Sequence, residues 1–447
     1  MIKEETFMKN FDELSSTDFA ILDAIRRSGS LDRAILETYS GLSWPTVKKI
    51  FSQLQESENI QSSTNEQKCK EFVCNQGYFL GISIGTREIK AVFCDSQFQV
   101  LSYSDIRALV KNIPDSRVAS LIRKSSDYQV TKERTMSADG LYFCFESSSS
   151  QDVIADMITE IIEAYLTLGE ASQKLLGIGL AFPGVVEPQK EQIIACPNIP
   201  SLNGKELRGI LKHGLYDKLK EYEIPIYIEH NAKANFINEK ELLYSDQSEN
   251  SVAFKENVLC LYMGTGISLG GCINRTLITG STNSFGEIGH ISVSDDLTEF
   301  GKDDHDVCPF CHQKCIEWLI RKNVFDASTI RDYRENSTTK KLKSLSQEKY
   351  KKLTQYLGYL LNVIINIFNP DVLILSGRIF DNIEELRGDI EALKSSHTLS
   401  FSGSNCKIVL GKGGQYGIAR GAAFNTYMRH YTFKDKRIQW PTTGDHI

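Results

Sequence analysis

Three cysteines, Cys308, Cys311 and Cys315, lie close together in one short stretch of the chain. Thiolate sulfurs completed by one imidazole nitrogen form a closed tetrahedral zinc site, which fixes a loop without carrying out chemistry. Three ordinary reduced thiols in a loop are the plain alternative, and a lone cysteine would favour it. Because the three thiols are clustered, we expect a structural zinc site at this loop.

Two glycine-rich stretches could bring backbone N–H groups close to phosphate oxygens. Gly81-Ile82-Ser83-Ile84-Gly85 lies between two strand candidates, and Gly264-Thr265-Gly266 follows a strand candidate that ends at Met263. Each stretch alone is more typical of a tight turn. The two stretches become informative because two further motifs lie at the ends of predicted elements, Phe182-Pro183-Gly184 and Gly286-Glu287-Ile288-Gly289-His290.

The elements that must position these residues alternate between strands and helices. Apolar runs predict strands over Phe79–Ile84, Ile89–Asp95, Leu176–Ala181, Ile224–Glu229, Val258–Met263 and Val372–Ser376. Apolar residues also recur at helical spacing from Val153 to Ile162. Strands that alternate with helices over this length indicate an α/β architecture. The stretch of about 104–140 has little periodicity and many charges, and we interpret it as an insertion.

Residues 1–60 carry the pattern of three short helices. The first ends near Ser28-Gly29, Asp32 is a suitable N-cap for the second, and Ser43 caps a third with Pro45 in its first turn. Two helices joined by a short glycine-containing turn are what a helix-turn-helix needs, because the second helix must enter the major groove. The polar stretch 61–76 then predicts a wing and a linker.

The bulk composition limits the classes of protein to consider. At 447 residues the chain is too long for one ordinary domain, and its net charge of −6 excludes a global basic field for nucleic acid. The sequence has no apolar run long enough to span a membrane and no signal-peptide core in Met1–Asn10. Eleven cysteines without a secretory signal are typical of reduced thiols. We therefore expect a cytoplasmic protein with no membrane partner.

Taken in order, the motifs resemble those of the ROK family of repressors and sugar kinases, which shares the actin/hexokinase-like (ribonuclease H-like) fold. The resemblance covers most of Tyr78–Tyr427 and includes Pro197-Asn198-Ile199-Pro200, Glu229-His230-Asn231-Ala232 and Cys308–Glu317. Gly29 to Ile60 resembles the winged helix of the repressor branch, such as xylose and N-acetylglucosamine repressors. The resemblance implies an N-terminal winged helix-turn-helix over 1–76, followed by a two-lobed α/β sugar-binding domain over 77–447.

Two carboxylates that the kinases of this family use are absent. Phosphorylation of a sugar needs a base that takes the proton from the attacking hydroxyl. By the resemblance, Asn231 stands where kinases carry the catalytic aspartate, and Ser83 replaces the aspartate of their first phosphate loop. An amide accepts no proton at neutral pH, although it can hydrogen-bond a hydroxyl. The resemblance thus implies a non-catalytic relative with remnants of the nucleotide loops, namely Gly85, Gly264, Thr265 and Gly266. An ATP-dependent sugar kinase with a fused helix-turn-helix is the alternative.

The same resemblance implies a retained pocket for a sugar or a sugar phosphate. Its residues would be Gly184, Asn198, Asn231, Glu287, His290 and Glu317. Carboxylates suit this role because each can accept two hydroxyl hydrogen bonds, although an isolated glutamate would more simply be a surface acid. His230 and Lys233 depart from the family's pattern.

The resemblance also supplies a fourth ligand for the zinc. The family uses the histidine of its Gly-Glu-x-Gly-His motif with three cysteines, which implies the ligands His290, Cys308, Cys311 and Cys315. The middle thiol is displaced by one position from the family's spacing, and His305 or His312 could replace one ligand.

Candidate DNA contacts gather at the start of the third helix, and they are Ser43, Trp44, Thr46, Lys48 and Lys49. Against this interpretation, residues 1–60 hold seven Lys/Arg and ten Asp/Glu, so a module for protein contacts is an alternative. Operators usually match a two-fold symmetric protein, and we expect a homodimer or homotetramer on operator DNA. The sequence thus predicts a sugar-responsive repressor of carbohydrate metabolism genes. A non-catalytic sugar sensor that docks a protein partner is the third alternative.

Overall fold

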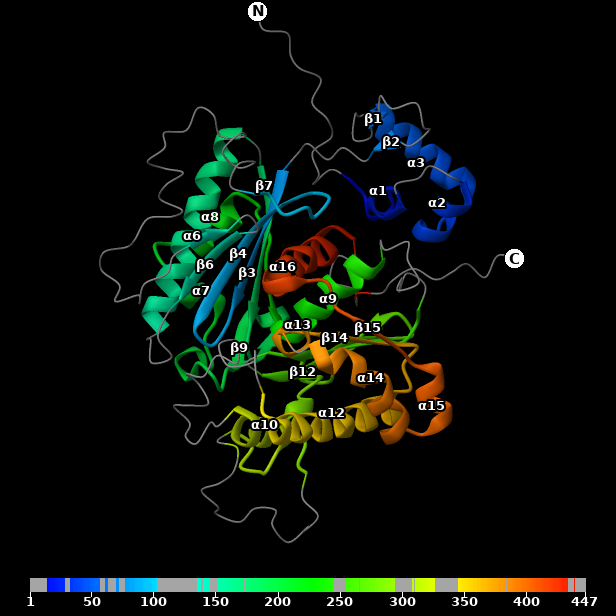
Figure 1. The fold of residues 1–447 in the computed structure, drawn as a ribbon. Helices are drawn as coiled ribbons and strands as arrows, with labels where there is room; N and C mark the ends of the chain where they lie inside the picture. Colours follow the sequence, from blue (N-terminus) through cyan, green and yellow to red (C-terminus); the bar gives the residue numbers. More distant parts are fainter. Residues whose placement is uncertain are drawn as a thin grey trace, which may run out of the picture.

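The computed structural model describes residues 14–28, 33–56, 61–62, 70–71, 77–102, 135–137, 140–144, 151–172, 174–244, 255–264, 266–293, 308, 310–325, 345–382, 384–432 and 438. Figure 1 shows a small N-terminal helical module beside two lobes, each of which is built on its own sheet. Among the described residues, no helix is long and apolar enough to cross a membrane.

The N-terminal module consists of α1 (Ser16–Ser28), α2 (Arg33–Ser40), α3 (Trp44–Glu56) and the antiparallel pair β1 (Gln61–Ser62) and β2 (Lys70–Glu71). A reciprocal cap begins α1, because Ser15 Oγ accepts the N–H of Asp18 and the Asp18 carboxylate accepts the N–H of Ser15. Apolar side chains at helical spacing bury one face of α3, as the sequence predicts.

The first lobe is built on a six-stranded sheet in the order β10-β7-β3-β4-β6-β5. These strands are β3 (Gly77–Ile84), β4 (Glu88–Asp95), β5 (Thr135–Ser137), β6 (Gly140–Cys144), β7 (Lys174–Phe182) and β10 (Ile226–His230). Strand β3 pairs antiparallel with β4 and parallel with β7, which pairs parallel with β10. One face packs against α6 (Gln151–Ser172) in a shared apolar core. The lobe also contains β8 (Val185–Glu187), β9 (Gln192–Ala195), α7 (Leu207–Ile210) and α8 (Leu215–Glu221).

The second lobe is built on a five-stranded sheet in the order β13-β12-β11-β14-β15. These strands are β11 (Val258–Met263), β12 (Ile267–Ile273), β13 (Thr276–Leu277), β14 (Val372–Ser376) and β15 (Lys407–Leu410). Its helices are α10 (Ile316–Phe325), α12 (Gln347–Phe368), α13 (Arg378–Asn382), α14 (Glu384–His397) and α15 (Ser400–Asn405). Strands β11 and β14 are parallel, so the loops that follow them leave the same edge of the sheet.

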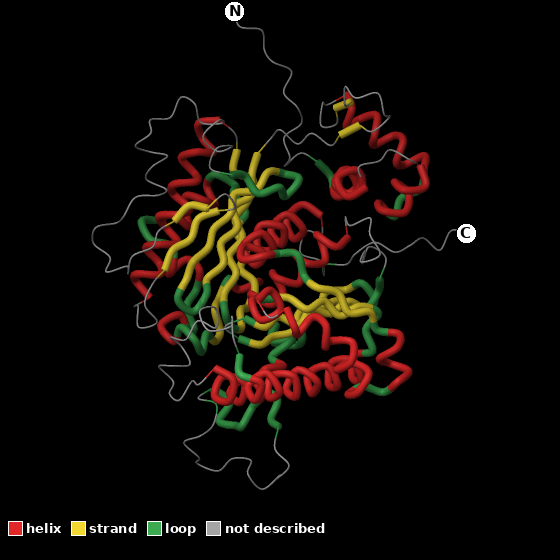
Figure 2. The backbone as a smooth tube through the Cα atoms, in the orientation of Figure 1, coloured by secondary structure: helices red, strands yellow, loops and turns green. Residues whose placement is uncertain are grey.

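Two helices, α9 (Asn231–Tyr244) and α16 (Gly417–Tyr427), lie between the two sheets (Figure 2). The backbone of α16 lies directly on the first sheet, because glycines on β3 and β7 leave room for it. A Cβ added at Gly81 would stand 1.9 Å from the carbonyl oxygen of Ala419, and one at Gly179 would stand 1.9 Å from that of Ala422. Helix α9 packs against α16 and against β11 and β12 of the second lobe.

Short helical turns complete the connections between these elements. They are the 3₁₀ turns η3 (Pro188–Lys190), η4 (Pro200–Leu202), η5 (Ile288–His290) and η7 (Gly414–Tyr416), and the π turn η8 (Met428–Thr432).

The six predicted strands are confirmed as β3, β4, β7, β10, β11 and β14, and the three N-terminal helices are confirmed as well. Sequence patterns missed β12, because Gly270 and Gly271 interrupt its apolar run. Most of the stretch 104–140 lies outside the described residues, as do Asp32 and most of 61–76. The described end of that stretch adds β5 and β6 to the first sheet.

Candidate functional site

A cleft lies between the two lobes and is lined by loops from both. The first lobe contributes the β3–β4 loop and the segments after β7 and β9. The second lobe contributes the segments after β11 and β14, η5 and the start of α10. Helix α9 contributes Asn231 and Asn235, and the start of α16 contributes Ile418.

All six residues of the predicted sugar pocket line this one cleft, although they are spread over more than a hundred positions of the sequence. Gly184 lies between β7 and β8, and Asn198 follows β9. Asn231 begins α9, directly after the last residue of β10. Glu287 and His290 flank η5, and Glu317 stands in the first turn of α10.

Three polar atoms around the cleft are buried and have no hydrogen-bond partner among the described residues. They are Asn198 Oδ1, His230 Nδ1 and Asn231 Oδ1. The amide nitrogen of Asn231 is already committed, because Nδ2 donates to the carbonyl oxygen of Ile84 at 2.9 Å. A buried polar atom without a partner loses about 1–3 kcal/mol, so a ligand that supplied hydrogen bonds here would be stabilised.

Two carboxylates face the cleft from the second lobe. Glu317 is held in place because its Oε2 accepts the N–H of Ile267 at 2.7 Å, and burial raises the pKa of its carboxyl group. Glu287 Oε1 lies 3.7 Å from His230 Nε2, and its Oε2 lies 4.0 Å from His290 Nε2. Glu287 therefore connects the cleft to the cysteine loop.

His230, at the end of β10, is an uncharged residue at neutral pH. Burial, together with the positive charge of Lys233, lowers the pKa of its imidazole to about 4, although the charge of Glu229 opposes the shift. The side chain is therefore a neutral hydrogen-bonding group beside the cleft.

The carboxylate of Glu229, two residues before Asn231, is held by cationic side chains inside the protein. Glu229 is fully buried, and its Oε2 accepts from Arg429 Nη2 at 2.7 Å. Burial alone would raise the pKa of Glu229, but Lys233 and Arg429 together lower it to about 2. Lys233 Nζ also donates to the backbone and side-chain oxygens of Asn283, both at 2.6 Å. Lys233, which sequence reasoning could only mark as unusual, thus anchors the loop before η5.

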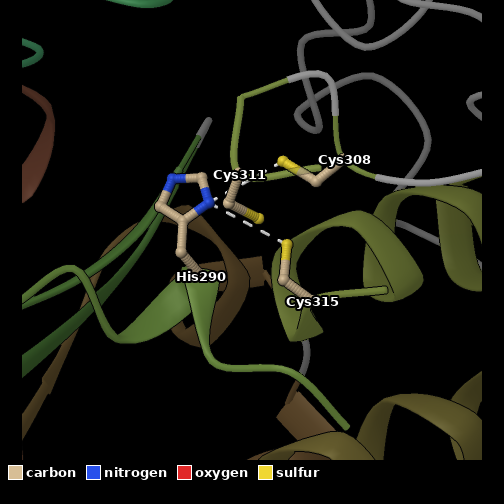
Figure 3. A group of neighbouring side chains, drawn as sticks. All are labelled: His290, Cys308, Cys311 and Cys315. Atoms are coloured by element: carbon tan, nitrogen blue, oxygen red, sulfur yellow. Dashed lines mark hydrogen bonds between the residues drawn. The ribbon is translucent and has the colours of Figure 1, made fainter. Parts of the chain in front are cut away.

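The cysteine loop brings four ligand atoms together (Figure 3). His290 and the three thiols of Cys308, Cys311 and Cys315 offer atoms that all lie within 4.8 Å of one another. His290 Nδ1 lies 3.7 Å from Cys308 Sγ and 3.9 Å from Cys315 Sγ. Three soft sulfurs and one imidazole are the donor set of a closed zinc site, so these residues fit that metal. The exposed His312 is not part of the group, and His305 lies outside the described residues.

Only some of the residues predicted as nucleotide-loop remnants line the cleft. Gly85 and Gly266 line it, as does Ser83 of β3. Gly264 follows β11 and packs against the ring of Tyr262 instead. Thr265 lies outside the described residues.

The predicted DNA contacts fall into two groups by exposure. Ser43, Lys48 and Lys49 are exposed, whereas Trp44 and Thr46 are partly buried. The backbone N–H of Trp44 donates to Glu37 Oε1 at 2.7 Å, and its ring packs against the apolar core of the module. Trp44 therefore joins α3 to α2 within the module, besides its predicted role in contacting DNA.

The chain is similar in sequence to proteins named as repressors. It is 22% identical to the xylose repressor of Bacillus subtilis (strain 168), an alignment that covers 94% of this chain and 96% of the relative. It is 21% identical to the DNA-binding transcriptional dual regulator NagC of Escherichia coli (strain K12), over 87% of each chain.

Solved structures share the fold. A ROK family transcriptional regulator, a homolog of the E. coli MLC protein, superposes with a TM-score of 0.62 and 18% identity over 92% of this chain and 96% of the other. A ROK hexokinase from Thermus thermophilus gives a TM-score of 0.52 and 20% identity over 80% and 100%. The sequence profile of the ROK family matches residues 144–426, from the end of β6 in the first lobe through the second lobe and nearly all of α16. The chain therefore belongs to the ROK family.

Proposed function

We propose that the chain is a sugar-responsive repressor of carbohydrate metabolism genes, which binds operator DNA as a dimer and a sugar in the cleft. The observation that carries this proposal is the set of unpartnered buried atoms on Asn198, His230 and Asn231, which can receive or offer hydrogen bonds to hydroxyl groups. The names of the repressor relatives favour a regulator over a kinase.

The same cleft is unsuited to catalysis. By the resemblance to the kinases, the residue in the position of the base is an amide, Asn231, and the neighbouring carboxylate of Glu229 is held by Arg429 and Lys233. A base has to be able to receive the proton that leaves the attacking hydroxyl. We therefore propose that Asn231 and Ser83 leave a pocket that binds a sugar without phosphorylating it.

We propose that residues 1–76 form a winged helix-turn-helix and that residues 77–447 form the sugar-binding part. In this arrangement α3 is the recognition helix and the pair β1–β2 is the wing. Lys48 and Lys49 are exposed on α3 and would contact phosphates, which makes binding dependent on salt. Because the chain carries a net charge of −6, DNA affinity must come from this local face and from pairing of two modules in a dimer.

The two helices between the sheets offer a route by which a sugar could affect the DNA-binding module. Helix α9 begins at the cleft with Asn231, and near its other end Glu241 forms an ion pair with Arg26 of α1. Helix α16 begins at the cleft near Ile418, and its last residue, Tyr427, packs against Phe19 of α1.

A ligand shifts a conformational equilibrium only by its difference in affinity between the two states. A sugar that favours one closure of the lobes would move the cleft ends of α9 and α16. The other ends of α9 and α16, against which α1 packs, would move as well. The separation of two recognition helices in a dimer would then differ between the sugar-bound and sugar-free states.

We propose that zinc bound by His290, Cys308, Cys311 and Cys315 has a structural role in this design. The metal would fix His290, and through it the position of Glu287 at the cleft. Away from this cluster, Cys94, Cys196, Cys260, Cys272 and Cys406 are free thiols, which suits a reducing cytoplasm.

The proposal is tested by a thermal-shift screen of the purified full-length protein against monosaccharides, amino sugars and their 6-phosphates, with and without Mg-ATP. A sugar that raises the melting temperature without ATP, and without release of ADP, supports a binding pocket. An Asn231→Ala variant that still folds but shows a weaker response to that sugar would locate the pocket. Release of ADP by the wild type in a coupled assay would contradict the proposal and favour a kinase.

A further inference from the structure

A carboxylate of the protein itself lies in the part of the cleft that is bounded by the first glycine loop. Glu88 begins β4, and the N–H of Gly85 donates to its backbone carbonyl at 2.7 Å, which closes the turn. The Glu88 side chain folds back over that turn, because a Cβ at Gly85 would stand 3.0 Å from Glu88 Cγ and 3.8 Å from Oε1. The space that an unsubstituted glycine leaves above this loop is thus occupied by Glu88.

Two cationic side chains hold this carboxylate from opposite sides of the cleft. Lys90 Nζ, also on β4, donates to Glu88 Oε1 at 2.6 Å. Arg378 belongs to the second lobe, and its Nη2 donates to both carboxylate oxygens at 3.1 Å. Lys90 is 5% exposed, and all three residues line the cleft. The carboxylate of Glu88 thus binds one ammonium and one guanidinium group, and its pair with Arg378 connects the two lobes.

A glycine turn with a lysine and an arginine beside it has the components of an anion site. Here the chain itself supplies an anion, so one of the two positive charges is balanced before any ligand arrives. A phosphate group that entered this space would have to displace Glu88 or lie against a like charge.

We propose that Glu88 is a specificity-determining residue: it occupies the anion subsite of the cleft and makes the protein select uncharged ligands over nucleotides and phosphorylated sugars. This inference deepens the proposed function, because it names the uncharged sugars as the class that the cleft accepts. On this proposal ATP would bind poorly because of Glu88, whatever residue stands in the position of the kinase base.

The test uses anion binding, which requires neither a sugar nor DNA. Inorganic pyrophosphate, which presents the charge of a nucleotide without its base, is titrated into the full-length protein by calorimetry at constant ionic strength. We expect no saturable binding to the wild type. In Glu88→Gln the shape is kept and the charge removed, so Lys90 and Arg378 no longer face a carboxylate of the chain at this position. We expect this variant to bind pyrophosphate at least about tenfold more tightly than the wild type.

Two further variants make the outcome specific to this site. Glu88→Gln combined with Arg378→Gln should lose the gained affinity, because one of the two cations is removed. Glu348→Gln, which removes an exposed carboxylate paired with Lys352 on α12, should behave as the wild type. Glu88→Asp, which withdraws the carboxylate by one methylene, serves if the glutamine variant does not fold, and it should show a smaller gain.

Saturable binding of pyrophosphate to the wild type with the affinity of the variant would overturn the proposal, as would a folded Glu88→Gln or Glu88→Asp protein with no gain. If neither variant folds, the titration of the wild type still tests the proposal. Tight binding of pyrophosphate to the wild type would mean that Glu88 does not block the subsite. The predicted gain in pyrophosphate affinity requires neither sugar binding nor DNA binding. Failure of the proposed function can therefore be distinguished from failure of this inference.

Discussion

Replacement of Arg26 by methionine should release α1 from the body of the protein. Arg26 lies in α1 with 5% of its side chain exposed, and its Nη1 is 2.6 Å from Glu241 Oε1 while its Nη2 is 2.8 Å from Asp23 Oδ1. The guanidinium also lies 4.9 Å from the ring centroid of Phe424 on α16. Burial alone would lower the pKa of Arg26, but Glu241 and Asp23 outweigh it and raise the pKa. The residue is therefore charged and joins α1 to both α9 and α16.

Removal of one partner of a buried ion pair costs about 3–5 kcal/mol, because the other charge stays buried without compensation. Methionine retains most of the apolar volume, so the loss is chiefly electrostatic. We take the lower end of this range, about 3 kcal/mol. At about 1.4 kcal/mol for each factor of ten, the docking equilibrium of α1 should weaken by about a hundredfold.

Hydrogen exchange measured by mass spectrometry reads this equilibrium directly. In Arg26→Met the amides of α1 should exchange faster, while those of β3, β7 and β11 keep their protection. Arg33→Met is the matched control, because it removes an exposed arginine of the same module, paired with Glu37 on α2. That control should leave α1 unchanged, since exposed pairs contribute little.

The same variant tests the proposed coupling. If α9 and α16 carry the effect of the sugar, Arg26→Met should still bind the sugar but should no longer change its DNA affinity in response. Unaltered protection of α1, or an unaltered sugar response in a protein whose α1 is released, would refute the reasoning.

Three further outcomes follow from the site. Cys311→Ser should bind less than one equivalent of zinc by elemental analysis, and chelation of the wild type should lower its melting temperature, because a closed zinc site contributes to folding. Asn231→Ala should weaken sugar binding by about 1–2 kcal/mol in calorimetry, the scale of a hydrogen bond lost from a buried site. His230→Gln should flatten the dependence of unfolding free energy on pH. The pKa of His230 falls from 6.5 to about 4 in the folded state, so its contribution is full above about pH 6.5 and is lost as pH falls through about 4. A difference of about 2.5 in pKa, at about 1.4 kcal/mol for each unit, gives about 3.5 kcal/mol, which urea denaturation across that pH range would measure.

Local patterns predicted the elements whose apolar runs are uninterrupted. The strands β3, β7 and β14 are buried along almost their whole length, and such runs are visible in sequence. The strand β12 was not visible, because Gly270 and Gly271 allow Ala232 and Leu259 to approach and leave no apolar side chains at those positions. Which atoms pack against a glycine depends on segments far away in the sequence, so a local pattern cannot predict them.

Sequence patterns likewise predicted only one part of the candidate site. The cysteine loop and the glycine turns are short motifs, so their residue types and spacing were informative. The roles of Lys233, Glu88 and Arg378 were not predictable, because each depends on a partner from another element: Lys233 on Asn283, and Arg378 on Glu88 across the cleft. Likewise, the ion pair of Arg26 with Glu241 joins residues more than two hundred positions apart.

The central claim is that a sugar in the cleft changes the affinity of the protein for specific DNA. The most direct measurement selects DNA sequences from fragmented genomic DNA with the full-length protein. The fluorescence anisotropy of a selected duplex is then titrated at fixed salt, with and without the sugar found in the thermal-shift screen. We predict an enriched sequence with two-fold symmetry and a change in affinity of at least about tenfold, which is a coupling of about 1.4 kcal/mol. No enriched sequence, or equal affinity with and without a sugar that demonstrably binds, would contradict the account.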